Sequence, residues 1–366
     1  MNSELLYQLA LTLVPNIGDV QAKILLQSFG DASSIFKAKL SALEKLDGIG
    51  TVRAKSIKQF DDFHIAEEEI KFIEKYKIKA LFLTDADYPQ RLLNCYDSPT
   101  LLFYKGTTNL NASKVVGIVG TRSYTDYGKQ FTDNLVQDLS EQQVLVVSGL
   151  ALGIDAFAHK AALKYGLPTV GVVGHGLDKI YPATHTTLAK DMIKHDGGIL
   201  SEFFSGTKPD KHNFPLRNRI VAGLCDATIV VETNIKGGSM ITAKLADAYN
   251  RDVFAVPGRT TDHKSSGCNY LIKNNKAILL TDAAELCEVL GWTEKKKKPK
   301  LQKELFIELT AEERLVISIL QQKEAVSIDE INLNSGLSSS AVAAAILNLE
   351  LQGVIAGLPG KMYKLI

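Results

Sequence analysis

The middle of the chain, residues 76–292, alternates between short apolar segments and longer helix-like ones. The short segments are KVVGIVG, VLVVSG, TVGVVG, GGILSEF, ATIVVE, DVFAVPG and AILLTD. Segments of ordinary helical length lie between most of them, among them YGKQFTDNLVQDLSEQQ and SMITAKLADAYN. Strands that are apolar on both faces are typical of a parallel sheet covered by helices on both sides and joined by right-handed crossovers. The pattern predicts an α/β domain with a Rossmann-like parallel sheet core.

Residues 1–75 are predicted to form an all-helical domain. Two stretches within it, VPNIGDVQAKILLQSFGD and KLDGIGTVRAKSI, share an Ile-Gly pair followed by a small alanine. They resemble a pair of helix-hairpin-helix units (a SAM-like arrangement), in which the glycine turn lets backbone N–H groups approach a phosphate. Short glycine turns also simply join packed helices, so both interpretations remain open.

The C-terminal part divides into a basic linker, residues 293–308, and a second folded domain, residues 309–366. Thr310 and Glu313 are spaced as a capping box ahead of an apolar helix. The order helix, helix, turn, helix and two-stranded tail is that of a winged helix. Its expected recognition helix, LSSSAVAAAILNLELQG, contains no Lys or Arg, which favours contacts with protein over contacts with DNA. Lys361 and Lys364 on the expected wing leave a modest DNA role open.

Charge and cysteine usage exclude several classes of protein. The formal net charge is only +1, so a uniformly basic nucleic-acid coat is excluded and any anion site must be local. The four cysteines show no CxxC spacing, which indicates reduced thiols in a cytoplasmic protein. The opening segment ELLYQLALTLV has the spacing of an amphipathic helix rather than of a signal peptide, and no segment is apolar enough to span a bilayer. We therefore expect a soluble cytoplasmic protein.

The segments that follow the predicted strands point to a binding site, because ligands of open parallel sheets bind beyond the carboxyl ends of the strands. These segments are GTRSYTDYG, SGLALGID, GHG, FPLRNR, TNIKGGSMITA and PGRTTDHKSSG. Arg217 and Arg219 fall at the predicted start of a helix, where cations are unfavourable unless an anion meets them. We expect them to join Arg122 and Lys236 in one electropositive rim suited to phosphate.

Aromatic residues in or beside the same loops favour single-stranded nucleic acid, because unpaired bases stack on aromatic rings. Core packing is the alternative, especially for Phe203. The aromatic residues are Tyr124, Tyr127, Phe203, Phe204 and Phe214.

Other ligands and chemistries have weaker support. No GxGxxG follows the first of these strands, and no GxxxxGK[ST] occurs anywhere. Asp155 and His159 share a helix face, but an N-terminal Asp with a satisfied His explains them better than an acid–base pair. His175, His185 and His212 lack metal-ligand spacing. We expect no metal, no cofactor and no catalytic residues.

The motifs of the central domain resemble those of the DNA-processing protein A (DprA/Smf) family. They are VGIVGTRSYTDYG, VVSGLALGIDAFAHKAAL, GHGLDKIYPATH, GGILSEF, FPLRNRIVAGLCDATIVVE, KGGSMITAKLADAYNRDVFAVPG and GCNYLIKNNKA, in family order. The flanking domains resemble the family's usual attachments. The resemblance implies a non-enzymatic cytoplasmic homodimer that binds single-stranded DNA, protects incoming DNA and loads RecA recombinase during natural transformation.

The resemblance also implies a basic DNA-contacting pocket on the Rossmann-like domain. YPATH departs from the family pattern, because Ala183 and Thr184 leave that part of the rim uncharged. Leu271 and Ile272 are the predicted dimer interface, with ordinary core as an equally open alternative. The predicted DNA-binding residues are Gly120, Thr121, Arg122, Ser148, Gly149, Phe214, Arg217, Asn218, Arg219, Lys236, Gly237, Gly238, Ser239 and Lys244.

The alternative function is a nucleotide-binding enzyme of the phosphoribohydrolase type, whose loop reads PGGxGTxxE. Here IKGGSMITAKLA matches at Gly237 and Gly238 but places no carboxylate near Ala243. Glycosidic cleavage needs a positioned acid or nucleophile. Glu232 is the nearest candidate, and we interpret it as structural.

Overall fold

The computed structural model describes residues 3–293 and 309–366. Contacts divide the chain into two units, Met1–Leu279 and Leu280–Ile366. The predicted linker 293–308 lies outside the described residues except for its first position.

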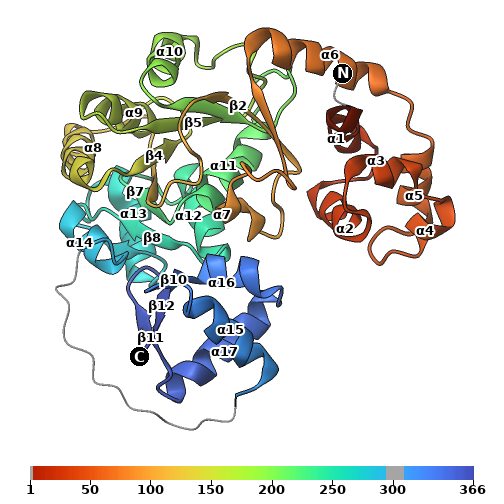
Figure 1. The fold of residues 1–366 in the computed structure, drawn as a ribbon. Helices are drawn as coiled ribbons and strands as arrows, with labels where there is room; N and C mark the ends of the chain where they lie inside the picture. The colour runs from red at the N-terminus through yellow and green to blue at the C-terminus, as the bar shows by residue number, and fades with distance from the viewer. Residues whose placement is uncertain (1–2, 294–308) are drawn as a thin grey trace. The chain divides into compact units, whose positions relative to one another are not determined.

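A mixed sheet in the order β1-β2-β6-β5-β4-β3-β7-β8-β9 forms the centre of the first unit (Figure 1). The strands from β6 to β9 in this order pair in parallel, whereas β1 and β2 pair antiparallel at one edge. The prediction of a Rossmann-like parallel core is confirmed; the antiparallel edge was not predicted. The strands are β1 Lys79–Phe82, β2 Leu101–Gly106, β3 Val115–Val119, β4 Leu145–Ser148, β5 Thr169–Val173, β6 Gly198–Ser201, β7 Ala227–Val230, β8 Asp252–Ala255 and β9 Ile278–Leu279.

The inner strands are buried because the crossover helices cover both faces of the sheet. β3, β4 and β5 are buried at every position, as expected for apolar runs that lack a polar alternation. The chain winds from β3 to β6 in one direction and then from β7 to β9 in the other. The strand order therefore reverses between β3 and β7, which is where ligands of such sheets bind. The helices of this region are α7 Gln90–Leu93, α8 Asp126–Leu139, α9 Ile154–Lys164, α10 Thr186–Lys194, α11 Asn213–Leu224, α12 Ser239–Ala248 and α13 Ser266–Lys273.

The N-terminal region is helical, and its second predicted hairpin joins α4 to α5. Gly48 and Gly50 have φ values of +78° and +62°, a conformation that favours glycine. Arg53 donates to the carbonyls of Asn16 and Gly48, each at 3.1 Å, so it holds the two predicted hairpins together. The helices are α1 Ser3–Leu13, α2 Asp19–Phe29, α3 Ala32–Lys37, α4 Leu40–Glu44, α5 Gly50–Lys58 and α6 Phe63–Tyr76.

The second unit contains α14 and the winged helix. Thr310 and Glu313 form the predicted capping box, each side chain bonding the other's backbone N–H. The predicted two-stranded tail is confirmed and gains β10 as a third strand, in the order β10-β12-β11. The elements are α14 Ala283–Val289, α15 Ala311–Leu320, β10 Val326–Ser327, α16 Ile328–Ser335, α17 Ser339–Leu351, β11 Ile355–Leu358 and β12 Met362–Leu365.

Across the described part of the chain, no helix combines the length and the apolar character needed to cross a membrane.

A candidate nucleic-acid interface

A cavity of about 330 Å³ opens at the reversal point between β3 and β7. We call it the switch-point cavity. The loops that follow β3, β4 and β7 line it together with α11 and the first turn of α12. Ten of the predicted DNA-binding residues meet there: Gly120, Thr121, Arg122, Gly149, Phe214, Arg217, Asn218, Gly237, Gly238 and Ser239.

Arg217 forms part of the inner wall of this cavity. Its side chain is almost fully buried, and Nη1 donates to the carbonyl of Val172 at 2.6 Å. The guanidinium lies directly over Gly149, where any side chain would overlap it. Nε of Arg217 is buried without a hydrogen-bond partner. Burial lowers the pKa of Arg217, and the charge of Asp155 opposes that shift.

Asp155 provides the negative charge that the sequence left unidentified for Arg217. Its carboxylate lies in the first turn of α9 and accepts from the backbone N–H of Gly149 at 3.1 Å. Burial raises the pKa of Asp155, whereas Arg217 and backbone N–H groups lower it. The sequence pattern indicated Asp155 only as a possible partner of His159. The missed signal is the spacing of GLALGID after β4, in which three residues separate GL from ID and a short loop brings the Asp155 carboxylate back to the end of the strand.

His159 is structural, as the sequence indicated. Its ring is completely buried, and Nδ1 shares a 2.6 Å hydrogen bond with the hydroxyl of Thr169. Burial lowers the pKa of His159 to about 3, so the ring is neutral at physiological pH. It does not line the switch-point cavity.

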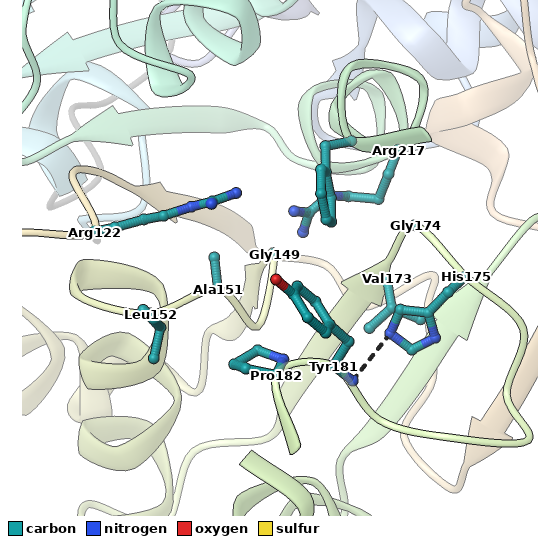
Figure 2. A pocket seen from close by; sticks show the side chains of 11 residues that line it. Arg122, Gly149, Ala151, Leu152, Val173, Gly174, His175, Tyr181, Pro182 and Arg217 are labelled. Carbon is teal, nitrogen blue, oxygen red and sulfur yellow. Dashed lines mark hydrogen bonds between the residues drawn. The ribbon is translucent and has the colours of Figure 1, made fainter. Parts of the chain in front are cut away.

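Arg122 is an exposed cation in the lining of the cavity. Its guanidinium lies 5.5 Å from the centroid of the Phe214 ring, a cation–π distance. The backbone of Arg122 is positioned by Gly153, whose φ of +84° and close approach leave no room for a side chain. Figure 2 shows Arg122 and Arg217 extending toward each other from opposite sides of the pocket.

The N-terminus of α12 forms another wall of the switch-point cavity. Gly237, Gly238 and Ser239 line it, and the hydroxyl of Ser239 is buried without a partner. No acidic residue occupies the first turn of this helix. A helix N-terminus with free N–H groups and a hydroxyl attracts anions.

A smaller aromatic pocket of about 40 Å³ adjoins the cavity and shares Arg122, Gly149 and Arg217 with it. The rings of Tyr181 and Phe214 are 6.1 Å apart at its side. The backbone N–H of Tyr181 donates to Nε2 of His175 at 3.2 Å (Figure 2). Tyr181, in the YPATH segment, and Lys211, which lines the larger cavity, were not among the predicted site residues.

Arg219 does not join this site, contrary to the prediction. It is buried and forms ion pairs with Glu202 and, at 2.9 Å, with Asp19 of α2. The predicted helix start was also wrong: α11 begins at Asn213, so the arginines lie in its second turn. Positions two apart on a helix differ by roughly 200° in direction, which sends Arg217 and Arg219 to opposite sides.

Three further predicted residues lie outside the cavity lining. The hydroxyl of Ser148 is buried and donates to the carbonyl of Ile118 at 2.6 Å. Lys236 and Lys244 are exposed beside the loop and helix that line the cavity. They add positive charge near the site without forming its wall.

Leu271 is buried in the core, with only 3% of its surface exposed. Ile272 is half-buried and packs against the same core. The alternative that the sequence left open, ordinary core, therefore describes Leu271, and the prediction that it presents an exposed dimer surface was wrong.

The other predicted aromatic residues divide between the surface and the core. Tyr124 and Tyr127 are exposed. Phe204 packs edge-on against Phe103 of β2, with ring centroids 5.4 Å apart. Phe203 and Phe204 both line a separate cleft against α1 and α2, so neither is a stacking surface at the switch-point cavity.

Glu232 has a structural position. Its carboxylate is buried and accepts hydrogen bonds from the backbone N–H of Thr125 at 2.9 Å and from the Thr125 hydroxyl. Thr125 is the N-cap of α8. Among the residues the structure describes, no group of three or more His, Cys, Asp or Glu side chains is arranged to hold a metal ion.

The fold and the cavity together define a class: Rossmann-like proteins with an electropositive cavity at the reversal of strand order. The model of the family described as DNA recombination-mediator protein A matches residues 79–291. Models of the DprA winged helix domain and of the helix-hairpin-helix motif match residues 302–361 and 6–68. The chain belongs to the DNA-processing protein A (DprA/Smf) family.

Individual relatives agree with this assignment. The chain is 34% identical to protein Smf of Synechocystis over 99% of both chains. It is 41% identical to DNA processing protein DprA of Streptococcus pneumoniae over 63% of this chain and 79% of the relative. The X-ray structure of the Streptococcus pneumoniae protein superposes with a TM-score of 0.66 and 35% identity over 76% of this chain and 95% of that one. A Helicobacter pylori DNA processing protein A structure, described for its unique single-stranded DNA binding mode, gives a TM-score of 0.52 and 32% identity over 57% and 94%.

Proposed function

We propose that this protein binds single-stranded DNA at the switch-point cavity, protects incoming strands and loads RecA recombinase onto them during natural transformation. The observation that carries the proposal is the position of Arg122. Its exposed guanidinium lies over Phe214 at a cavity that also contains Arg217 and the N-terminus of α12. The cationic groups of such a cavity attract phosphate, and exposed aromatic rings beside it provide stacking surfaces for unpaired bases.

The protein acts in this proposal as a binder and mediator in the cytoplasm, not as an enzyme. Glu232 was the candidate carboxylate for the alternative, an enzyme of the phosphoribohydrolase type. Its oxygens accept hydrogen bonds from the N–H and the hydroxyl of Thr125. RecA as the partner and a homodimer as the assembly are part of the proposal, and the resemblance to the family is what supports them. With Leu271 in the core, the dimer surface has to involve other residues.

The test is the titration of labelled single-stranded and duplex oligonucleotides at about 50 and about 200 mM salt. We expect a preference for single strands and an affinity that falls with salt, with a slope of about −0.7 per phosphate contacted. Arg122→Glu should weaken binding about tenfold or more, which is on the order of 1.4 kcal/mol. Since Arg122 is exposed, its reversal should leave the melting temperature unchanged.

Lys190→Glu is the matched control, because Lys190 is an exposed cation on α10, away from the cavity lining. Equal affinity for duplex DNA, or equal losses in the Arg122 and Lys190 variants, would show that the switch-point cavity is not the binding site.

A further inference from the structure

A second group of aromatic and basic side chains lies on α8, on α9 and in the loop that leads from β3 into α8. We call it the α8–α9 platform, made of Tyr124, Lys129, Phe157 and Lys160. The rings of Tyr124 and Phe157 meet edge to face with centroids 4.4 Å apart. Nζ of Lys129 and Nζ of Lys160 lie 5.4 and 5.8 Å from the centroid of the Phe157 ring. One ring is therefore held by a second ring and by two ammonium groups from different helices.

The platform is accessible to a ligand. Tyr124 is 41% exposed, Lys129 and Lys160 are exposed, and Phe157 is half-buried. Leu152 is 48% exposed, precedes the first residue of α9 by two positions and lines the aromatic pocket. Buried packing does not account for two lysines directed at one partly exposed ring.

The platform is connected to the lining of the switch-point cavity through the backbone. Tyr124 follows Arg122 by two residues, and Gly153 contacts the backbone of Arg122. The N–H of Phe157 donates to the carbonyl of Gly153 at 3.1 Å. Phe157 is thus one helical turn, about 5.4 Å, beyond the point where Arg122 is positioned.

The local charge is positive. Besides Arg122, Lys129 and Lys160, Lys264 approaches the platform and donates to the carbonyl of Tyr124 at 3.4 Å. Asp126 is the acidic residue in the first turn of α8. Asp133, one turn after Lys129, is engaged by Lys164 at 2.9 Å and by the hydroxyl of Tyr165 at 2.8 Å.

We propose that a single strand bound in the switch-point cavity continues across the α8–α9 platform, with a base against Phe157 and Tyr124 and phosphates beside Lys129 and Lys160. This rests on the proposed function and extends its footprint. Alternating rings and cations match the bases and phosphates of an unpaired strand. Duplex DNA hides its base faces, so it would use only the cations.

The test compares short oligonucleotides of about 4 nucleotides with long ones of about 16. The double variant Lys129→Gln, Lys160→Gln removes the charges without adding acidic groups beside Asp126. We expect it to weaken long-strand binding at least tenfold and to reduce the salt slope by about 1.4, which is two contacts at about 0.7 each. Binding of the short strand should change less than twofold, because the cavity is intact.

Phe157→Leu is the second variant, since it retains apolar volume while removing the ring. It should weaken long-strand binding at least fivefold without changing the salt slope, because stacking carries no counterion release. Lys190→Gln, Lys194→Gln on α10 is the matched control, and its long-strand affinity should equal that of the unmodified protein.

Unchanged long-strand affinity in the platform variants, or equal losses for short and long strands, overturns the inference. Failure of the proposed function has a different signature. In that case the unmodified protein does not prefer single strands, or Arg122→Glu binds as tightly as the unmodified protein.

Discussion

Arg217 and Arg219 show how strongly a residue's role depends on its surroundings. Both belong to one RNR triplet, and both are buried. Arg217 lies beside Asp155 at the switch-point cavity, while Arg219 pairs with Asp19 and Glu202 on the other side of α11. A cation with two carboxylates beside it has little charge left to offer a phosphate. Only Arg217 contributes to the candidate site.

The buried ring of His159 provides a prediction for pH dependence. Burial lowers the pKa of His159 to about 3 from an ordinary value of 6.5. Below pH 6.5 the unfolded chain takes up a proton at this ring and the native state does not. The free energy of unfolding therefore decreases as the pH is lowered. We expect a loss of about 2 kcal/mol from His159 between pH 7.5 and pH 5.

Urea unfolding of the protein and of His159→Gln at the two pH values measures this contribution. The variant should show a shallower loss of stability on acidification. The same pH dependence in both proteins would mean that His159 is protonated in the native state. Burial raises the pKa of Glu202 to about 7, so this group increases the free energy of unfolding as the pH is lowered. Its contribution is the same in both proteins.

At the scale of elements, α2 and α6 are fastened to the Rossmann-like domain by carboxylates. Asp19 of α2 accepts from the N–H and the hydroxyl of Thr100, both at 2.7 Å, as well as from Arg219. Glu69 of α6 accepts from the N–H and hydroxyl of Ser205. These bonds join α2 to the residue before β2 and α6 to the loop after β6.

Asp19→Ala should therefore affect stability and not DNA binding. It removes three hydrogen bonds, one of them to a charged group, and we expect a loss of about 1–3 kcal/mol in the free energy of unfolding. Affinity for single strands should stay within twofold. Asp87→Ala, at an exposed position, is the control. A large loss of affinity for single strands in a folded Asp19 variant would indicate that Asp19 and its partner Arg219 do take part in DNA binding.

At the scale of the whole molecule, the winged helix adds a domain of opposite charge to the candidate site. Residues 310–366 contain four basic and six acidic residues, a net charge of −2. Lys323 is in addition paired with Glu330 at 2.6 Å. Helix α17 carries no basic residue and exposes Leu347 and Leu351 at 57% and 78%. These features favour a protein partner over the major groove of DNA.

Truncation after residue 308, which retains the basic linker, should leave single-strand affinity within about twofold. An acidic domain without a basic recognition helix contributes little to phosphate binding. Anisotropy titration measures the affinity, and light scattering establishes that the truncated protein keeps its assembly state. A loss of most of the affinity in a folded protein would assign DNA binding to the winged helix.

Elements whose signals are local could be predicted from the amino-acid sequence alone. Apolar runs of strand length predicted the parallel strands β3 to β9, since parallel strands covered by helices need no polar alternation. Thr310 and Glu313 specified a helix start because their bonds close within one turn. Glycines and cations after the strands specified the edge of the sheet that holds the candidate cavity, because parallel strands end on one side.

Contacts between side chains required the folded structure, because the partners lie far apart in the chain. Asp155 reaches Arg217 only after β5 and β6 are folded between them, and Arg219 meets Asp19 across two domains. The spacing of Leu271 in its helix is compatible with a surface position and with a core position. Its packing in the folded protein places it in the core. Burial and pairing depend on the neighbours that folding supplies, and a linear sequence does not contain those distances.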